Sequence, residues 1–344
     1  MQPKIFLGWA SGSSPKYTTK AELAIKAPYD RSMARVFVLL ALFATIPLSG
    51  QRRVPVLIDT DIGDAIDDSL ALAFALSSPE LDVRGVTTVI DDVESKTRLA
   101  WKELGLYNRR DIPLAMGAPE PLLDPKLQSH PREFQVLTSS DKVPDTAQRT
   151  AAGFIVETLM NSRERITLVP IGPLTNIALA LKTEPRIKER IDRIVLMGGA
   201  FSSSQTEYNI KRDPVAAAIV FGSGVPILAA GLDVTTPCKL RAQDLERLRV
   251  AESPAALFLF RLIEISQAET GEMYPTLYDP LALALIVRPD LVETSEGKVD
   301  VSLSEGLGRG QTRFTPVAGG TTRVGVRVNS QAFLDLFVQR LASH

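Results

Sequence analysis

Residues 54–68, VPVLIDTDIGDAIDD, decide how this chain folds. The first half is a continuous apolar run that ends in acids, which is typical of a buried parallel strand. Gly63 permits a tight bend, and the spacing of DDSLALAFALSS (67–78) predicts a helix directly after it. The stretch therefore predicts the first strand-turn-helix unit of an α/β sheet.

The same alternation continues toward the C-terminus. We expect strands at 81–90, 166–172, 193–200 and 225–235, and helices at 93–106, 150–162, 174–185, 213–224, 255–270 and 279–287. A mostly loop stretch, 112–144, and a β-rich tail with a final helix capped by Asn329 complete the chain. This pattern predicts an α/β fold: a single domain with a doubly wound, mostly parallel sheet and helices on both faces. Ligands should collect at the carboxyl ends of its strands.

Composition excludes several classes of function. The 344 residues are 45% hydrophobic and 23% charged, which is ordinary globular usage. A net charge of −1 argues against nucleic acid as a partner. The single cysteine, Cys238, excludes an intramolecular disulfide and a cysteine zinc cluster. The two histidines are His130 and His344, so a mechanism that needs a histidine pair is not expected.

The first 50 residues resemble a targeting segment rather than part of the fold. An apolar run at 36–48 follows Arg31 and Arg35 and precedes Ser49 and Gly50, the pattern of a secretory signal peptide. The run is shorter than the roughly 20 residues of a membrane span. We therefore expect an N-terminal extension plus signal peptide at 1–50, with Met33 as the true start, and a catalytic domain at 51–344. Export to the periplasm or medium follows, without stable membrane insertion after cleavage; an uncleaved anchor is the alternative.

The turn after the first strand is unusually acidic. Five carboxylates crowd it: Asp59, Asp61, Asp64, Asp67 and Asp68. Alternation along a strand places the first two on one side, and the last two open a helix, where the helix dipole favours negative charge. Helix capping explains one or two of these acids, but not five. Hard oxygen ligands without histidine or cysteine indicate calcium or magnesium.

Further acids stand at the ends of other elements. Asp91 and Asp92 follow the second expected strand, and Asp279 opens a late helix after Tyr278. Each alone is compatible with a solvated loop acid. Because strand ends converge in a doubly wound sheet, their repetition favours one shared site.

Six motifs occur in an order that resembles a known family. They are DTDIGDAIDD (59–68), VPIGPLTNIALAL (169–181), IVLMGGAF (194–201), EYNIKRDPVAA (207–217), AGLDVTTP (230–237) and YDPLALA (278–284). From residue 54 onward the chain resembles the inosine-uridine-preferring nucleoside hydrolases. The resemblance implies a single α/β domain, a tightly bound Ca²⁺, hydrolysis of ribonucleosides to ribose and free base, and a homodimer or homotetramer.

The resemblance also implies a metal site. Asp61, Asp68 and Asp279 match the metal-ligand aspartates, and Asp61 also matches the general base. Ile171 stands where the family offers a main-chain carbonyl to calcium. Asp59 would support the site from behind these ligands. Anions near the ribose stabilise the positive charge that develops as the glycosidic bond breaks. No covalent intermediate is needed, so we predict inversion at the anomeric carbon.

Other positions match substrate contacts. Asp67 matches the acceptor of the ribose 2′-hydroxyl, and Glu207 and Asn209 match the pair that holds the 5′- and 3′-hydroxyls. Met197 lies in the strand end that lines the ribose pocket. Asp92 stands where an asparagine is common, and we expect it to contact ribose or calcium.

The chain departs from the family in the leaving-group region. Tyr278 stands where several members carry a histidine, and we expect its phenol to donate a proton to the leaving base or to stack against it. His130 lies in a loop near where some members place another histidine. Compared with the family's first motif, two extra residues separate Gly63 from the Asp67-Asp68 pair, so we expect Asp64 to lie behind the ligands or at the surface.

Two alternatives stay open from the sequence. The altered residues favour, in one reading, a non-catalytic exported protein that binds a nucleoside or sugar on the same scaffold. In the other, Asp59-Thr60-Asp61 imitates the DxD motif of a haloacid-dehalogenase-like phosphatase. An Asp61→Asn substitution separates catalysis from binding alone.

Overall fold

The elements of the fold alternate as the sequence predicts. The computed structural model describes residues 53–123, 132–250 and 253–342; the expected signal peptide, Met33 and His130 lie outside these ranges. The strands are β1 (Val54–Thr60), β2 (Leu81–Thr88), β3 (Leu114–Ala115), β4 (Ile166–Pro170), β5 (Ile191–Met197), β6 (Ile227–Ala230), β7 (Val292–Val301), β8 (Thr312–Pro316) and β9 (Thr322–Val328). The helices are α2 (Ile66–Leu76), α3 (Val93–Leu106), α4 (Ala151–Asn161), α5 (Thr175–Thr183), α6 (Tyr208–Arg212), α7 (Pro214–Phe221), α8 (Leu232–Thr235), α9 (Ala242–Arg249), α10 (Pro254–Thr270), α11 (Tyr278–Val287) and α12 (Ser330–Ala342).

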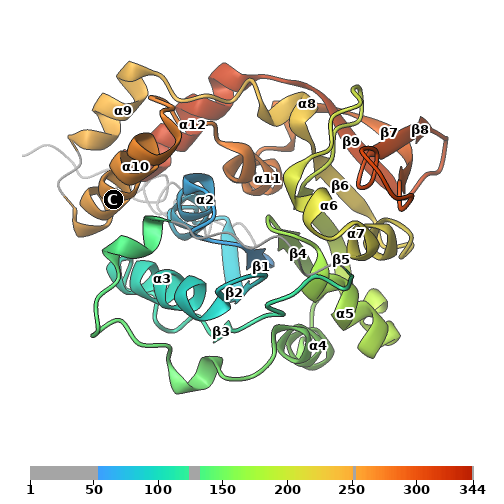
Figure 1. Cartoon of the computed structure of the whole chain (residues 1–344), viewed down its shortest axis with the longest axis horizontal. Coiled ribbons are helices and arrows are strands. Elements are labelled where there is room, and N and C mark those ends of the chain that lie inside the picture. Colours follow the sequence, from blue (N-terminus) through green and yellow to red (C-terminus); the bar gives the residue numbers. More distant parts are fainter. Residues whose placement is uncertain (1–52, 124–131, 251–252, 343–344) are drawn as a thin grey trace, which may run out of the picture. The chain divides into compact units, whose positions relative to one another are not determined.

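The strands of the described ranges form one sheet in the order β3-β2-β1-β4-β5-β6-β9-β7-β8 (Figure 1). Neighbouring strands from β3 through β9 are parallel, and β7 runs antiparallel to both β9 and β8. The predicted doubly wound, mostly parallel sheet is confirmed. The strand order reverses between β1 and β4, and ligands bind at such a switch point in open α/β sheets.

Side chains alternate between two cores along the central strands. In β1, Val56 and Ile58 belong to one core and Leu57 to the other. Helices α2, α10, α11 and α12 pack on the first face of the sheet, and α4, α5 and α7 on the second (Figure 1). None of the helices in the described ranges is long and apolar enough to cross a bilayer.

The structure differs from the expectation at 225–235. Strand β6 ends at Ala230, and the residues that follow form the short helix α8. The Asp233 carboxylate in α8 accepts hydrogen bonds from the main-chain N–H groups of Phe201 and Ser202, both at 2.8 Å. These contacts hold the loop after β5 and turn the chain away from the sheet. The expected cap of the last helix is confirmed, because Asn329 Oδ1 accepts from the Ala332 N–H at 3.1 Å.

Candidate active site

A cavity of about 430 Å³ opens at the carboxyl ends of the central strands. Asp61 follows β1, Ile171 follows β4 and Met197 ends β5, so the cavity lies at the switch point. Its lining comprises Asp61, Asp64, Ala65, Asp67, Asp68, Ile171, Met197, Thr206, Glu207, Tyr208, Asn209, Leu232, Tyr278 and Asp279. The structure thus brings together every predicted site residue except Asp59 and Asp92.

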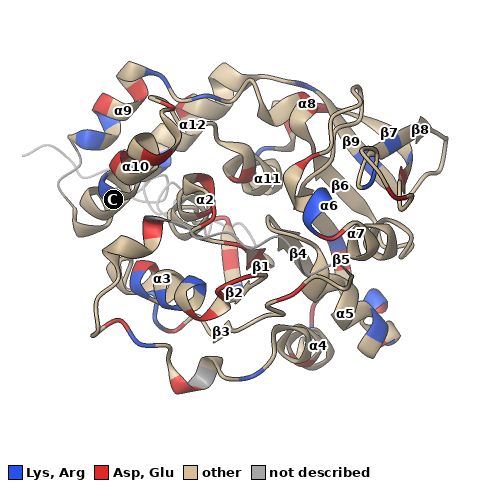
Figure 2. Ribbon diagram, in the orientation of Figure 1, with Lys and Arg blue, Asp and Glu red and all other residues tan. Residues whose placement is uncertain are grey.

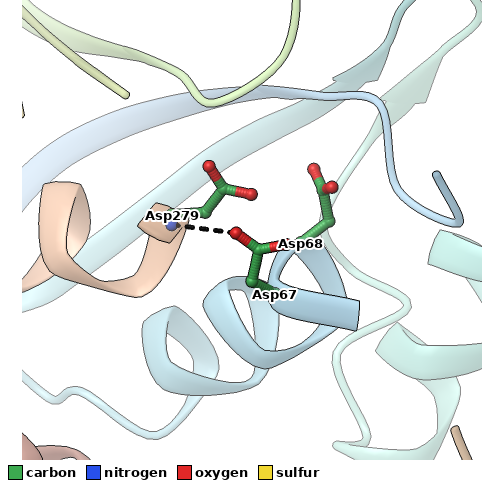
Figure 3. Close-up of side chains that lie close together, drawn as sticks. All are labelled: Asp67, Asp68 and Asp279. Carbon is green, nitrogen blue, oxygen red and sulfur yellow. Dashed lines mark hydrogen bonds between the residues drawn. The ribbon is translucent and has the colours of Figure 1, made fainter. Parts of the chain in front are cut away.

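Three carboxylates form the most acidic wall. Asp67 and Asp68 lie in the first turn of α2 and Asp279 in the first turn of α11, two helices that pack together. One oxygen of each carboxylate lies within 4.8 Å of the others (Figure 3). The Asp279 N–H donates to Asp67 Oδ2 at 3.3 Å. Figure 2 shows acidic residues on α2 and at the start of α11, where the helix dipoles favour negative charge.

The electrostatics of this wall suit a cation. Burial raises the pKa of Asp68 and Asp279 well above the usual range, and neighbouring carboxylates raise both further. Burial also raises the pKa of Asp67, to about 6. A bound cation would relieve both the desolvation and the mutual repulsion of these groups. Because the donors are all oxygens, the cluster fits a hard divalent cation such as calcium.

Asp61 stands beside this cluster at the end of β1. Its side chain is buried, and burial raises the pKa of its carboxyl well above the usual range, while the charge of Lys96 opposes that rise. The Thr60 hydroxyl links the strand end to α2: it donates to Asp68 Oδ1 at 2.5 Å and accepts from the Ile62 N–H at 3.0 Å. The path of the chain between Asp61 and α2 is therefore fixed by its own side chains.

The opposite wall consists of α6 and the ends of β4 and β5. Asn209 Nδ2 donates to the main-chain oxygens of Ile171, at 2.8 Å, and of Met197, at 3.3 Å. Because both hydrogen bonds use the amide nitrogen, the Asn209 group left for a ligand is the amide oxygen, which is an acceptor. The Glu207 carboxylate caps α6 and accepts from the N–H groups of Asn209 (2.8 Å), Ile210 (3.0 Å) and Gly199 (3.1 Å). Both side chains are thus held rigidly before any ligand arrives.

The two remaining predicted residues lie outside the lining. Asp59 is fully buried; its Oδ1 accepts from the Thr87 hydroxyl at 2.5 Å and from Asn176 Nδ2 at 2.8 Å. Its main-chain oxygen accepts from the Ile171 N–H at 2.8 Å, so Asp59 joins the ends of β1 and β4. Burial raises the pKa of Asp59 to about 7. Asp92 is different: it is exposed and caps α3.

The Asp92 expectation therefore needs correction. Its Oδ1 accepts from the Ser95 N–H at 3.0 Å, and the structure does not bring the carboxylate to the cavity. The preceding acid, Asp91, turns inward instead and forms a buried ion pair with Arg212 at 2.7 Å. We leave Asp92 out of the proposed substrate contacts.

Two tyrosines border the cavity. Tyr278, at the start of α11, is half-buried, and burial raises the pKa of its phenol, which keeps the proton on the oxygen. Tyr208, which sequence reasoning missed, is exposed and lies on α6 between Glu207 and Asn209. Its place in the sequence between Glu207 and Asn209, both predicted substrate contacts, could have indicated that Tyr208 borders the site. The Arg212 guanidinium lies 5.9 Å from the centre of its ring.

A doubly wound sheet with an oxygen-only cluster at its switch point defines an α/β enzyme whose site suits a hard cation. Residues 56–335 match the family model described as inosine-uridine preferring nucleoside hydrolase. The chain is 34% identical over 307 residues to the pyrimidine-specific ribonucleoside hydrolase RihA of Escherichia coli, which covers 84% of this chain and 98% of that protein.

Solved structures of nucleoside hydrolases have the same fold as this chain. A plant nucleoside hydrolase superposes with a TM-score of 0.73 at 28% identity, over 85% of this chain and 99% of its own. The purine-preferring ribonucleoside hydrolase of Gardnerella vaginalis gives a TM-score of 0.72 at 29% identity, over 84% and 98%. This chain belongs to the inosine-uridine preferring nucleoside hydrolase family and is a ribonucleoside hydrolase. The family match leaves the phosphatase alternative without support.

Proposed function

We propose that this chain hydrolyses the N-glycosidic bond of ribonucleosides to ribose and free base, in a reaction that depends on calcium. One observation carries the proposal: a buried, oxygen-only group of aspartates faces a wall of rigid hydrogen-bond acceptors across a single cavity. The first suits a cation, and the second suits the hydroxyls of a sugar.

Asp61, Asp68, Asp279 and the main-chain oxygen of Ile171 are the groups that would hold calcium. The Ile171 oxygen already accepts from Asn209 Nδ2 at 2.8 Å, and a carbonyl oxygen has a second lone pair for a cation. When bound there, calcium would lower the pKa of a water molecule and orient the ribose diol. Lys96 supplies one positive charge beside these acids, and a divalent ion would balance more of their negative charge.

The ribose is held by acceptors on both walls. Asp67 accepts from the 2′-hydroxyl, the amide oxygen of Asn209 from the 3′-hydroxyl, and Glu207 from the 5′-hydroxyl, with Met197 packing against the sugar. Asp61 takes a proton from the attacking water as general base. The surrounding carboxylates stabilise the oxocarbenium-like transition state, and direct attack by water inverts the anomeric carbon.

The leaving base needs a proton, and Tyr278 is the group we assign to it. Its phenol lines the cavity from the first turn of α11, next to the acid Asp279. The phenol carries its proton at neutral pH, and burial raises its pKa further, which makes it a weaker acid. A phenol is a weaker acid than imidazolium, so base departure is expected to limit the rate for poor leaving groups.

We also propose that residues 1–50 direct export and that the mature chain assembles into a dimer or tetramer. The apolar run at 36–48 supports the first, and family resemblance alone supports the second. N-terminal sequencing of the protein from a cell envelope or medium fraction tests export. A full-length chain found only in cytosol would contradict it. Light scattering gives the assembly, and a monomer would refute that part.

The function is tested by base release from a panel of purine and pyrimidine nucleosides. The full chain is assayed with calcium and after exhaustive chelation, with free base measured by chromatography. We expect release that needs calcium in wild type and is lost in Asp61→Asn, with nucleoside binding retained. If wild type binds calcium and nucleoside without releasing base, the chain is a binding protein and the proposed activity is wrong.

A further inference from the structure

A buried lysine faces the turn that separates Asp61 from the acids of α2. Lys96 lies in the first turn of α3, and its side chain has 0% exposure. Its Nζ lies 3.0 Å from Asp64 Oδ1 and donates to the Val89 main-chain oxygen at 3.2 Å. Lysine is almost never fully buried without a partner, and a cation in the first turn of a helix opposes the helix dipole. Full burial and a place in the first turn of α3 are both unfavourable for Lys96, which indicates a role for the Lys96–Asp64 ion pair.

The partner, Asp64, belongs to the cavity. It lines the cavity wall, and its side chain is 6% exposed. It lies in the turn between β1 and α2, where its main-chain N–H donates to the main-chain oxygen of Asp61 at 3.1 Å. The same turn contains Gly63 at φ +99°, and a Cβ there would lie 2.4 Å from the Phe134 ring. The turn is therefore packed against Phe134 at Gly63 and paired with Lys96 at Asp64.

The position of this turn sets the spacing of the cation ligands. Asp61 precedes the turn, and Asp68 follows it at the start of α2. A displacement of the turn moves one ligand relative to the other. Lys96 is in turn fixed by α3 and by the Val89 oxygen just beyond the end of β2. The pair thus ties the acidic turn to the neighbouring strand.

We propose that the Lys96–Asp64 ion pair positions the calcium ligands on the two sides of the turn, so that its loss weakens calcium binding. Both are positioning residues, and neither is a ligand. The proposal rests on the proposed function for its metal. It reverses what simple electrostatics predicts, because a positive charge beside a cation site opposes cation binding. Removing Lys96 should tighten calcium binding if only its charge matters.

The test uses the full chain in four forms: wild type, Lys96→Met, Asp64→Asn and the double variant. Calcium affinity is measured by isothermal titration calorimetry without substrate, and kcat and KM with uridine and inosine. Loss of a partner that orients metal ligands typically weakens metal binding or activity by about 10- to 100-fold. We expect a loss in that range for Lys96→Met. The double variant preserves the net charge of the site but lacks the pair, and we expect about the same loss.

A matched control comes from the same helix. Lys102 in α3 forms an ion pair with Asp141 at 2.9 Å, and neither residue lines the cavity. Because neither side chain lines the cavity, the Lys102→Met and Asp141→Asn double variant should keep calcium affinity and kcat within about twofold. Thermal unfolding of each variant separates a loss of fold from a loss of positioning. If Lys96→Met alone fails to fold, calcium affinity is compared between wild type and the double variant instead. The double variant buries no unpaired charge and is therefore expected to fold.

Two results would overturn the proposal. One is tighter calcium binding in Lys96→Met with wild-type affinity in the double variant, which would mean that Lys96 acts through its charge. The other is calcium affinity in both variants within the range of the control pair, which would mean that the pair only supports the fold. Because calcium binding is measured without substrate, a chain that hydrolyses no nucleoside would refute the proposed function and still leave this test informative.

Discussion

A methyl group added at Gly172 is the smallest change that reaches Asp61 directly. Gly172 follows Ile171 at the end of β4. A Cβ at this position would lie 2.6 Å from Asp61 Oδ1 and 2.8 Å from the Asp61 main-chain nitrogen. Real Cβ atoms do not approach other atoms so closely, so Gly172→Ala must displace either Asp61 or the β4 end with its Ile171 oxygen.

The size of the effect follows from these distances. A C···O contact begins at about 3.3 Å, so Asp61 and the β4 end must separate by about 0.7 Å. Overpacking of this kind costs about 1–3 kcal/mol of stability. A misplacement of about 1 Å in a catalytic group can cost about 100-fold in rate, so we expect kcat to fall by about 10- to 100-fold. Calcium affinity should fall with it, since Asp61 is also an expected ligand.

The assay compares Gly172→Ala with Gly85→Ala. A Cβ at Gly85 in β2 would meet the Phe154 ring at 2.4 Å, in the core on the second face and away from the cavity. Both variants should unfold at lower denaturant concentration, but only Gly172→Ala should lose kcat and calcium affinity. Wild-type kcat in a folded Gly172→Ala protein would refute the position that we assign to Asp61.

Four further predictions follow from the same geometry. Asp68→Asn should weaken calcium binding, measured by calorimetry, by more than about 100-fold, because it removes a charged ligand rather than a neighbour of one; affinity near wild type would remove Asp68 from the site. Tyr278→Phe should lower kcat by about 10²- to 10⁴-fold with calcium affinity intact if the phenol is the general acid, whereas an unchanged kcat would assign Tyr278 to packing. Asp92→Ala should destabilise the chain by about 1 kcal/mol in urea through loss of the α3 cap and leave KM unchanged; a raised KM would restore Asp92 to the substrate contacts. In chelator, stability should fall as pH rises from about 4, the ordinary pKa of an aspartate, to about 6, the raised pKa of Asp67, because in that window the folded state retains a proton that the unfolded chain has already released; the slope is about 1.4 kcal/mol per pH unit for each retained proton, saturating calcium should flatten it, and a stability that rises with pH across this window would contradict the buried carboxylates.

Much of the fold could be predicted because its information is local. The apolar run before Asp59 and the helical spacing after Asp67 lie within one short stretch, and β1 and α2 form as expected. Strand ends converge in any doubly wound sheet, so acids placed at strand ends and helix starts meet in one cavity. Asp61, Asp68 and Asp279 were therefore within reach of the sequence alone.

What could not be predicted depends on contacts between distant segments. Asp91 and Asp92 are chemically alike. The backbone is left-handed at Ile90 and Asp91 (φ 59° at each), and there the Asp91 carboxylate pairs with Arg212 while Asp92 caps α3. Lys96, a cation near a helix start, resembles a solvated residue until the turn of Asp64 is placed against it. The end of β6 also involves a distant segment, because Asp233 in α8 accepts hydrogen bonds from Phe201 and Ser202 in the loop after β5.

Calcium at the aspartate cluster is expected to support hydrolysis in this cavity. The most direct test of this expectation titrates calcium into the chelated full chain while bound calcium and base release from uridine or inosine are followed in the same sample. We predict one site per chain and a rate that rises in proportion to its occupancy. Base release at the full rate from a chain verified to be free of calcium, or a filled site with no release from any nucleoside, would contradict the account.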